Sequence, residues 1–150
     1  MRIAVIHGPN LNMLGVREPE LYGTVTLAEI DGQIFALASE LDIEVEAFQS
    51  NCEGAILDYL AQSRDRVDGV LVNPAGLGHT SVVLLDGLLA TGRPFVEVHL
   101  TNPAAREAFR RRSRIAPAAV GTVAGLGLQS YLLGLRGLYH HIHEGDAKHR

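Results

Sequence analysis

Residues 2–10 read Arg-Ile-Ala-Val-Ile-His-Gly-Pro-Asn. Within this stretch Ile3–Ile6 is a short apolar run rich in β-branched residues, which is typical of a β-strand. A histidine, a glycine, a proline and an asparagine follow at once, and this pattern indicates a polar turn where the strand ends. The rest of the chain repeats the order of strand, polar turn and helix, and the repetition predicts the fold.

The later apolar runs predict further strands, and helical patterns lie between and after them. Strands are expected at Glu44–Phe48, Val70–Val72, Phe95–Val98 and Val120–Ala124. Helices are expected at Thr26–Leu41, which opens with a capping box of Thr26 and Glu29, and at Glu53–Gln62, Ser81–Thr91, Ala104–Arg111 and Leu128–Tyr139. Successive parallel strands require crossover connections. The alternation therefore predicts a flavodoxin-like, doubly wound α/β domain with a five-stranded parallel sheet.

The composition fits one globular domain over residues 1–150. Hydrophobic residues make up 47% and charged residues 20% of the chain, the balance of a protein with a packed core. The formal net charge of −4 argues against nucleic acid as the main partner, because such binding depends on neutralising phosphates. The basic run at residues 110–114 is therefore interpreted as a solvated or interface face.

The single cysteine, Cys52, excludes an internal disulfide and any Cys-x-x-Cys pattern, and it is compatible with a reducing, cytoplasmic location. The N-terminal apolar run is too short for a secretory signal. No apolar stretch approaches the length of a membrane span, so no membrane partner is expected.

One connection is longer than the short loops expected in such a fold. Residues 8–25 show neither helical nor strand periodicity and contain Pro9, Gly15, Pro19 and Gly23. Long irregular loops in compact domains are usually functional lids, so an active-site lid is predicted at about residues 15–23. A flexible tail is predicted at about residues 144–150.

Polar residues follow the predicted strands, at the edge where open α/β sheets bind ligands. They are His7 to Asn12, Gln49 to Asn51, Asn73 with Pro74, and His99 to Asn102. Each amide or hydroxyl has the alternative role of an ordinary turn or N-cap residue. Their coincidence at four strand ends favours a ligand site.

His99 and Glu97 lie two residues apart and so share one face of a predicted strand. A carboxylate beside an imidazole fixes its tautomer and favours its protonated form, which suits a general acid. The alternative is a histidine that is merely hydrogen-bonded at a strand end. Farther back in the chain, the hydroxyls of Thr80 and Ser81 are explained equally well as caps of the following helix. That role does not explain His79 before them, whose side chain could hold a hydroxylated ligand.

Arg17 and Tyr22 share the predicted lid. A guanidinium stabilises the negative charge of a tyrosinate, so this pair could supply a base, although an exposed pair without a role is the alternative.

Other chemistries lack support in the sequence. Gly125-Leu126-Gly127 is interpreted as tight helix–strand packing, because a dinucleotide fingerprint belongs after the first strand. His140, His141 and His143 are interpreted as solvated. A Gly-x-Ser-x-Gly elbow, a His-Glu-x-x-His helix and a Walker loop are absent from the sequence.

With these residues set out, the chain resembles the type II 3-dehydroquinate dehydratases over roughly residues 2–139. The segments that carry the resemblance are Gly8-Pro9-Asn10-Leu11-Asn12-Met13-Leu14-Gly15, Arg17-Glu18-Pro19-Glu20-Leu21-Tyr22-Gly23, Phe48-Gln49-Ser50-Asn51, Asn73-Pro74, His79-Thr80-Ser81, Phe95-Val96-Glu97-Val98-His99 and Ala105-Arg106-Glu107. The resemblance implies a hydro-lyase of the shikimate pathway or of quinate catabolism. The enzyme would convert 3-dehydroquinate to 3-dehydroshikimate through an enolate, without metal or organic cofactor.

The resemblance also implies roles for individual residues. Tyr22 would be the base, Arg17 its cationic neighbour, Asn10 a stabiliser of the enolate, and His99, aligned by Glu97, the general acid. The implied substrate-binding residues are Asn73, His79, Asp86, Leu100, Thr101 and Arg110. Asp86 would come from a neighbouring subunit of a homododecamer built as a tetramer of trimers.

The sequence departs from the family pattern at several places. Pro74-Ala75-Gly76 stands where Pro-Gly-Ala is usual, Leu85 replaces an arginine, Thr101 replaces a serine and Cys52 replaces a histidine. The alternatives kept open are a catalytically impaired paralogue that binds a small hydroxylated cyclic acid, and a flavin or nucleotide module. The lack of a phosphate loop after the first strand weakens the latter.

Overall fold

The computed structural model describes residues 1–148, with side chains through residue 145. Its centre is an all-parallel sheet of five strands in the order β2-β1-β3-β4-β5. The strands are β1 (Arg2–His7), β2 (Glu44–Gln49), β3 (Gly69–Asn73), β4 (Phe95–His99) and β5 (Gly121–Ala124). The chain leaves β1 toward β2 and later returns to β3 on the other side of β1. The strand order therefore reverses between β1 and β3.

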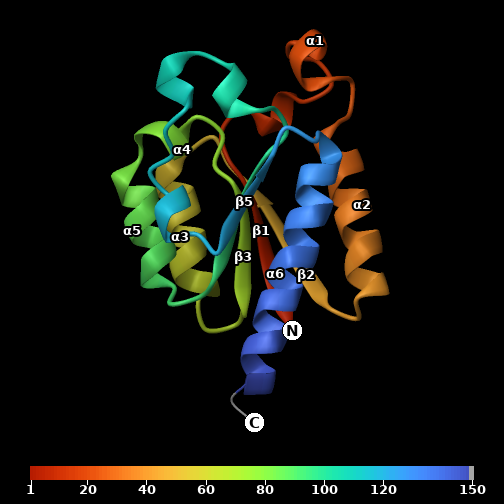
Figure 1. Cartoon of the computed structure of the whole chain (residues 1–150), viewed down its shortest axis with the longest axis vertical. Helices are drawn as coiled ribbons and strands as arrows, with labels where there is room; N and C mark the ends of the chain where they lie inside the picture. Colours follow the sequence, from red (N-terminus) through yellow and green to blue (C-terminus); the bar gives the residue numbers. More distant parts are fainter. Residues whose placement is uncertain (149–150) are drawn as a thin grey trace.

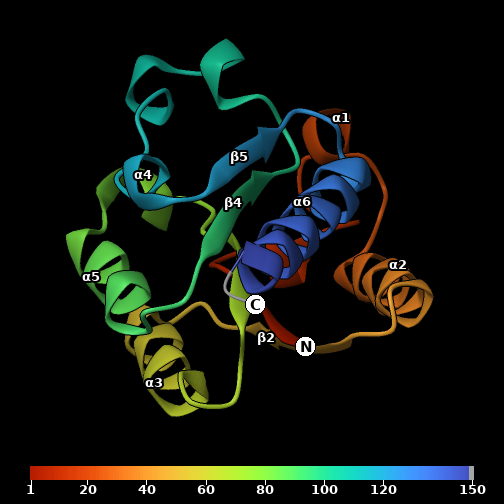
Figure 2. The same cartoon turned by 60° about the horizontal axis from the view of Figure 1, so that its bottom comes forward.

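Helices cover both faces of the sheet. One face carries α2 (Leu27–Glu40) and α6 (Leu128–Lys148), and the other carries α3 (Glu53–Ser63) and α5 (Val82–Ala90) (Figures 1 and 2). Two single-turn helices, α1 (Pro19–Tyr22) and α4 (Leu77–Thr80), lie near the carboxyl ends of the strands (Figure 1). The four short 3₁₀ segments are η1 (Leu11–Met13), η2 (Pro103–Ala105), η3 (Ala108–Arg110) and η4 (Ala116–Ala118).

Each face of the sheet has its own hydrophobic core, because alternate residues of a strand point to opposite faces. Ile3, Val5 and Leu71 pack with α2 and α6, whereas Ala4 and Ile6 pack with α3 and α5. The central strands are buried on both faces, which explains their nearly continuous apolar sequences.

The predicted doubly wound α/β domain is confirmed, and each predicted strand is present within about two residues of its expected ends. The capping box is also present: the Thr26 hydroxyl accepts from the Glu29 amide at 3.2 Å, and the Glu29 carboxylate accepts from the Thr26 amide at 3.0 Å.

The predicted helix at Ala104–Arg111 is wrong. The segment forms the separate 3₁₀ turns η2 and η3, and Arg106 between them is extended, with φ −100° and ψ −163°. Neither turn contains a buried residue. A short helix without a buried apolar face lacks the packing that stabilises most protein helices.

The last helix is longer than predicted, since α6 continues from Tyr139 through Gly145 to Lys148. The three histidines at 140, 141 and 143 therefore lie in this helix. Residues 144–148 of the predicted tail are helical too. Residues 149 and 150 lie outside the described part of the chain. Within that part, no helix is both long and apolar enough to cross a bilayer.

The contact of α6 with the sheet gives a stability prediction. A Cβ atom on Gly134 would lie 2.6 Å from Val98 Cγ1 and 2.9 Å from Leu71 Cδ1, whereas one on Gly137 of the same helix would meet nothing within 4 Å. Gly134→Ala should lower the free energy of unfolding by about 1–3 kcal/mol through overpacking. Gly137→Ala, the matched control, should raise it by up to about 1 kcal/mol through helix propensity. Denaturant unfolding of both variants measures the difference, and equal effects would contradict the close contact.

Candidate active site

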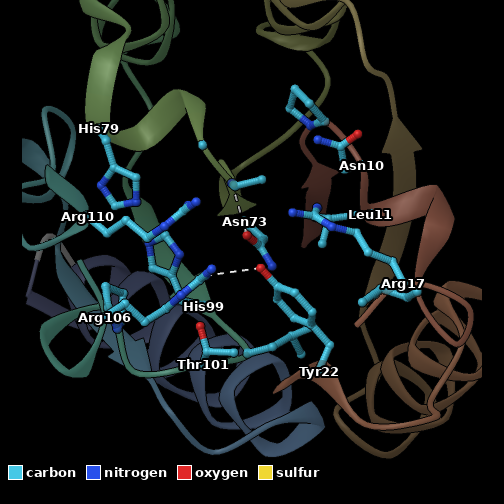
Figure 3. Close-up of a pocket in the computed structure, with 16 residues that line it drawn as sticks. Asn10, Leu11, Arg17, Tyr22, Asn73, His79, His99, Thr101, Arg106 and Arg110 are labelled. Atoms are coloured by element: carbon cyan, nitrogen blue, oxygen red, sulfur yellow. Dashed lines mark hydrogen bonds between the residues drawn. The ribbon is translucent and has the colours of Figure 1, made fainter. Parts of the chain in front are cut away.

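A pocket of about 220 Å³ opens above the carboxyl ends of β1, β3 and β4. Among the sequence-predicted site residues, Asn10, Arg17, Tyr22, Asn73, His79, His99, Leu100, Thr101 and Arg110 line it (Figure 3). Glu97 lies behind His99, and Asp86 lies elsewhere. The structure thus brings together polar side chains from the lid, three strand ends and the 103–112 segment.

The first βα turn approaches β3 so closely that only glycine fits at its start. The Gly8 amide donates to the Asn73 carbonyl at 2.8 Å, and a Cβ on Gly8 would lie 2.5 Å from the Pro74 oxygen. Asn10 has a left-handed backbone, with φ 70°, and its amide donates to the Asn51 side-chain oxygen at 2.8 Å. These contacts fix the turn that presents Asn10 to the pocket.

Tyr22 ends the single-turn helix of the lid, and its ring projects into the pocket (Figure 3). The Tyr22 hydroxyl accepts a hydrogen bond from Arg106 Nη1 at 3.0 Å. Arg17 Cζ lies 5.3 Å and Arg106 Cζ 5.7 Å from the centroid of the ring. One guanidinium group therefore contacts the Tyr22 hydroxyl directly, and the other lies over the ring.

The His99 imidazole is held by a buried carboxylate, as the sequence predicted. His99 Nε2 lies 2.6 Å from Glu97 Oε1, and the Glu97 side chain is 1% exposed. The Ser113 hydroxyl contacts Glu97 Oε1 and Oε2 at 3.0 and 2.8 Å and accepts from the amides of Ile115 and Ala116. Since an ionised carboxylate only accepts, Nε2 is the donor, and Nδ1 is left for the pocket.

The loop after β3 contains a strained residue. Asn73 Oδ1 accepts from the Ala75 amide at 3.1 Å, and Ala75 has φ 51°, in the left-handed region that favours glycine. An alanine there costs roughly 1–2 kcal/mol. The exchange of glycine and alanine at positions 75 and 76 thus places the methyl group at the strained position, where it also lines the pocket.

The opposite wall of the pocket consists of His79, Arg110 and the segment after β4. His79 Nδ1 donates to the Arg112 carbonyl at 2.7 Å, and the His79 and His99 rings are roughly parallel with centroids 6.1 Å apart. Arg110 Nε donates to Glu107 at 2.7 Å. Both Arg110 and His79 therefore have fixed positions beside His99.

Asp86 is exposed on α5 and does not line the pocket of its own chain. Its neighbour Leu85 packs against the core on the α3/α5 face, which accounts for an apolar side chain at that position. In the described residues, no group of three His, Cys, Asp or Glu side chains is placed to hold a metal ion.

Sequence reasoning gave no role to two residues of the site, Arg106 and Ser113. Arg106 appeared only within a motif, and its contact with Tyr22 joins residues 84 positions apart. Ser113 lies in a run of arginines and contacts Glu97 across 16 positions. Periodicity carries no signal for contacts between residues so far apart in the sequence.

Comparison with known proteins shows the family to which the chain belongs. The family model described as dehydroquinase class II matches residues 1–139. The chain belongs to the class II dehydroquinase family. A 3-dehydroquinate dehydratase of Geotalea daltonii is 51% identical over 142 residues, covering 95% of this chain and 99% of that protein. A 3-dehydroquinate dehydratase of Desulforudis audaxviator is 54% identical over 136 residues, covering 91% of this chain and 91% of that protein.

Solved dehydroquinase structures share the fold. The type II dehydroquinase of Butyrivibrio crossotus has a TM-score of 0.90 at 37% identity, covering 92% of this chain and 97% of the other. A 3-dehydroquinate dehydratase-like protein of Bifidobacterium longum has a TM-score of 0.69 at 26% identity, covering 93% and 96%. The resemblance inferred from the sequence motifs is therefore confirmed.

The contacts of Ser113 give a second prediction. Ser113→Ala removes the hydroxyl partner of a buried carboxylate and of two backbone amides, so the free energy of unfolding should fall by about 1–3 kcal/mol. Ser50→Ala is the matched control, because that hydroxyl caps an exposed turn at Cys52, and its effect should stay within about 0.5 kcal/mol. Denaturant unfolding compares the two, and a Ser113→Ala variant as stable as the parent would contradict this role.

Proposed function

We propose that this dehydroquinase-family chain eliminates water from 3-dehydroquinate to give 3-dehydroshikimate, as a hydro-lyase acting through an enolate. The observation that carries the proposal is the pairing of two proton-transfer groups in one pocket. These are a tyrosine hydroxyl held by a guanidinium and a histidine held by a buried carboxylate. The identity of the substrate is inferred from the relatives, which are named 3-dehydroquinate dehydratase.

In the first step the Tyr22 oxygen, as tyrosinate, takes a proton from carbon 2 of the substrate, and the electron pair of that C–H bond delocalises onto the ketone oxygen. Arg106 and Arg17 favour the tyrosinate, since both place a positive charge close to it. The amides of Asn10 and Asn73 stabilise the enolate oxygen, directly or through water, in the manner of an oxyanion hole.

In the second step His99 donates a proton to the hydroxyl on carbon 1, which leaves as water while the enolate collapses to the conjugated enone. Glu97 stabilises the imidazolium before this transfer and holds the ring in place. The cycle ends with a neutral tyrosine and a neutral histidine, and solvent restores their starting charges.

The remaining side chains of the pocket recognise the substrate. The backbone of Leu100 and Thr101 binds the carboxylate of the substrate, and the side chains of His79 and Arg110 bind its ring hydroxyls. The side chains assigned to proton transfer are all in place, so nothing favours the impaired paralogue. We also infer a cytoplasmic location, because the chain has one cysteine, Cys52, and so cannot form an internal disulfide of the kind common in secreted proteins.

We infer a homododecamer, a tetramer of trimers, in which Asp86 of one subunit completes the pocket of another. The location of Asp86 outside its own pocket supports this assembly. So do the exposed apolar side chains of Val82, Val83 and Leu89 on the same helix, since apolar surface of this kind marks protein contacts.

Tyr22→Phe tests the base. The variant keeps the ring and its contacts with the lid but cannot accept a proton, so kcat should fall at least about 100-fold. The assay follows the enone absorbance after 3-dehydroquinate is added in the presence of EDTA. Tyr139→Phe on α6 is the control and should retain full activity. If Tyr22→Phe raised KM and left kcat unchanged, the tyrosine would bind substrate and another group would be the base.

Asp86→Ala tests the assembly. Light scattering should give the mass of twelve subunits for the parent protein, and the variant should show a raised KM because the neighbouring pocket loses a ligand. Glu144→Ala, which removes an exposed carboxylate from α6, should change neither property. A fully active monomer would rule the assembly out.

A further inference from the structure

The carboxylate behind His99 is enclosed, and one side chain holds its second oxygen. Glu97 is 1% exposed, and its Oε1 lies 2.6 Å from His99 Nε2. The Ser113 hydroxyl lies 3.0 Å from Glu97 Oε1 and 2.8 Å from Glu97 Oε2. Among the described residues, Ser113 is the one hydrogen-bond partner of Oε2. Removal of its hydroxyl would therefore leave a buried carboxylate oxygen without a partner.

The Ser113 hydroxyl acts as a donor toward Glu97. A serine hydroxyl has one proton and two lone pairs. The amides of Ile115 and Ala116 donate to the Ser113 oxygen at 3.2 and 3.0 Å and use both lone pairs. The proton of the hydroxyl is left for the carboxylate, and a neutral Glu97 would find no acceptor at Ser113 for a proton of its own. Because a hydrogen bond to the charged form favours that form, Ser113 favours ionised Glu97 and leaves the proton of the pair on His99.

The backbone on either side of Ser113 is fixed to the single-turn helix α4. His79 Nδ1 donates to the Arg112 carbonyl at 2.7 Å, and the Arg114 amide donates to the Gly78 carbonyl at 2.7 Å. These two bonds join residues of the chain that lie more than thirty positions apart. They hold Ser113 in place within the folded chain, without a contribution from a ligand.

The charge of Glu97 matters because the pocket in front of His99 is rich in positive charge. Three arginines line the pocket, Arg17, Arg106 and Arg110, and within the described part of the chain no carboxylate lines it. Nearby positive charges disfavour an imidazolium, whereas a negative charge in contact favours it. Ionised Glu97 supplies that contact, so a group that keeps Glu97 ionised and in place also favours the protonated form of His99.

We propose that Ser113 is a positioning residue for the acid step, whose hydroxyl keeps the Glu97 carboxylate ionised and directed at His99. The inference rests on the role proposed above for His99 as the general acid. Ser113 does not line the pocket and acts on the reaction through the carboxylate.

Kinetics of three variants test the inference. Ser113→Ala should lower kcat about tenfold and change KM less than about threefold, because general-acid catalysis acts in the transition state. Ser113→Thr keeps the hydroxyl and should recover most of kcat. Ser63→Ala is the matched control, since Ser63 is also buried but its hydroxyl donates to the Leu60 carbonyl at 3.3 Å and does not line the pocket. Its kcat should not change.

A double-mutant cycle separates positioning from a general loss of structure. In a Glu97→Ala background, Ser113→Ala should lower kcat no further, since no carboxylate is left to hold. Glu97→Ala alone should lower kcat at least as much as Ser113→Ala does. If Glu97→Ala fails to fold, Glu97→Gln takes its place, because it fills the same space without the charge, and the further loss from Ser113→Ala should then shrink.

The proton on His99 Nε2 gives a readout that does not depend on turnover. A proton in a short hydrogen bond between an imidazole and a buried carboxylate is shielded from water and gives a low-field NMR signal. The parent protein and Ser63→Ala should show this signal. It should be lost in Glu97→Ala and broadened or shifted in Ser113→Ala.

The outcomes separate the possible failures. An unchanged kcat in Ser113→Ala, an unchanged Nε2 proton signal, or an equal loss of kcat with and without Glu97 would overturn the inference. A Ser113→Thr variant no more active than Ser113→Ala would also count against it. If His99→Ala kept full activity, the role proposed for His99 would fail and the inference with it. A parent protein that did not convert 3-dehydroquinate would refute the proposed function, and the NMR signal alone would then decide whether Ser113 holds the pair.

Discussion

Parallel pairing between β1 and β3 is the constraint on which the rest of the site depends. Its register sets His7 beside Asn73 and lets the Gly8 amide donate to the Asn73 carbonyl. Because the chain turns in opposite directions after these two strands, their polar ends are left uncovered by helices. The pocket forms in that space, and the lid, the loop after β3 and the segment after β4 close around it.

The charges of the site are divided between the two residues for which we propose proton transfer. Arg106 contacts the Tyr22 hydroxyl and Arg17 lies over the Tyr22 ring, whereas the Glu97 carboxylate contacts His99. In the proposed reaction, cationic neighbours favour a base that acts as an anion, and an anionic neighbour favours an acid that acts as a cation. These charges belong to side chains that the fold already holds in place.

Much of this arrangement could be predicted from the sequence, because buried strands produce apolar runs and strand ends produce polar ones. The pairing of Glu97 with His99 followed from strand periodicity alone. The predicted helix at 104–111 was wrong because helical propensity cannot show that no apolar face is buried there. The contacts of Arg106 and Ser113 join distant parts of the chain, so only the folded structure reveals them.

Buried polar side chains at the strand ends are held from opposite faces of the sheet. His7, at the end of β1, is held on the side of α2 and α6 by Asp31 and by the Tyr131 hydroxyl, whereas Glu97 of β4 is held by Ser113 beside Ile115 of the α3/α5 core. The sheet separates the two cores, so a substitution that repacks one core need not move the polar group that the other core holds. Evolution can therefore alter the two layers one at a time.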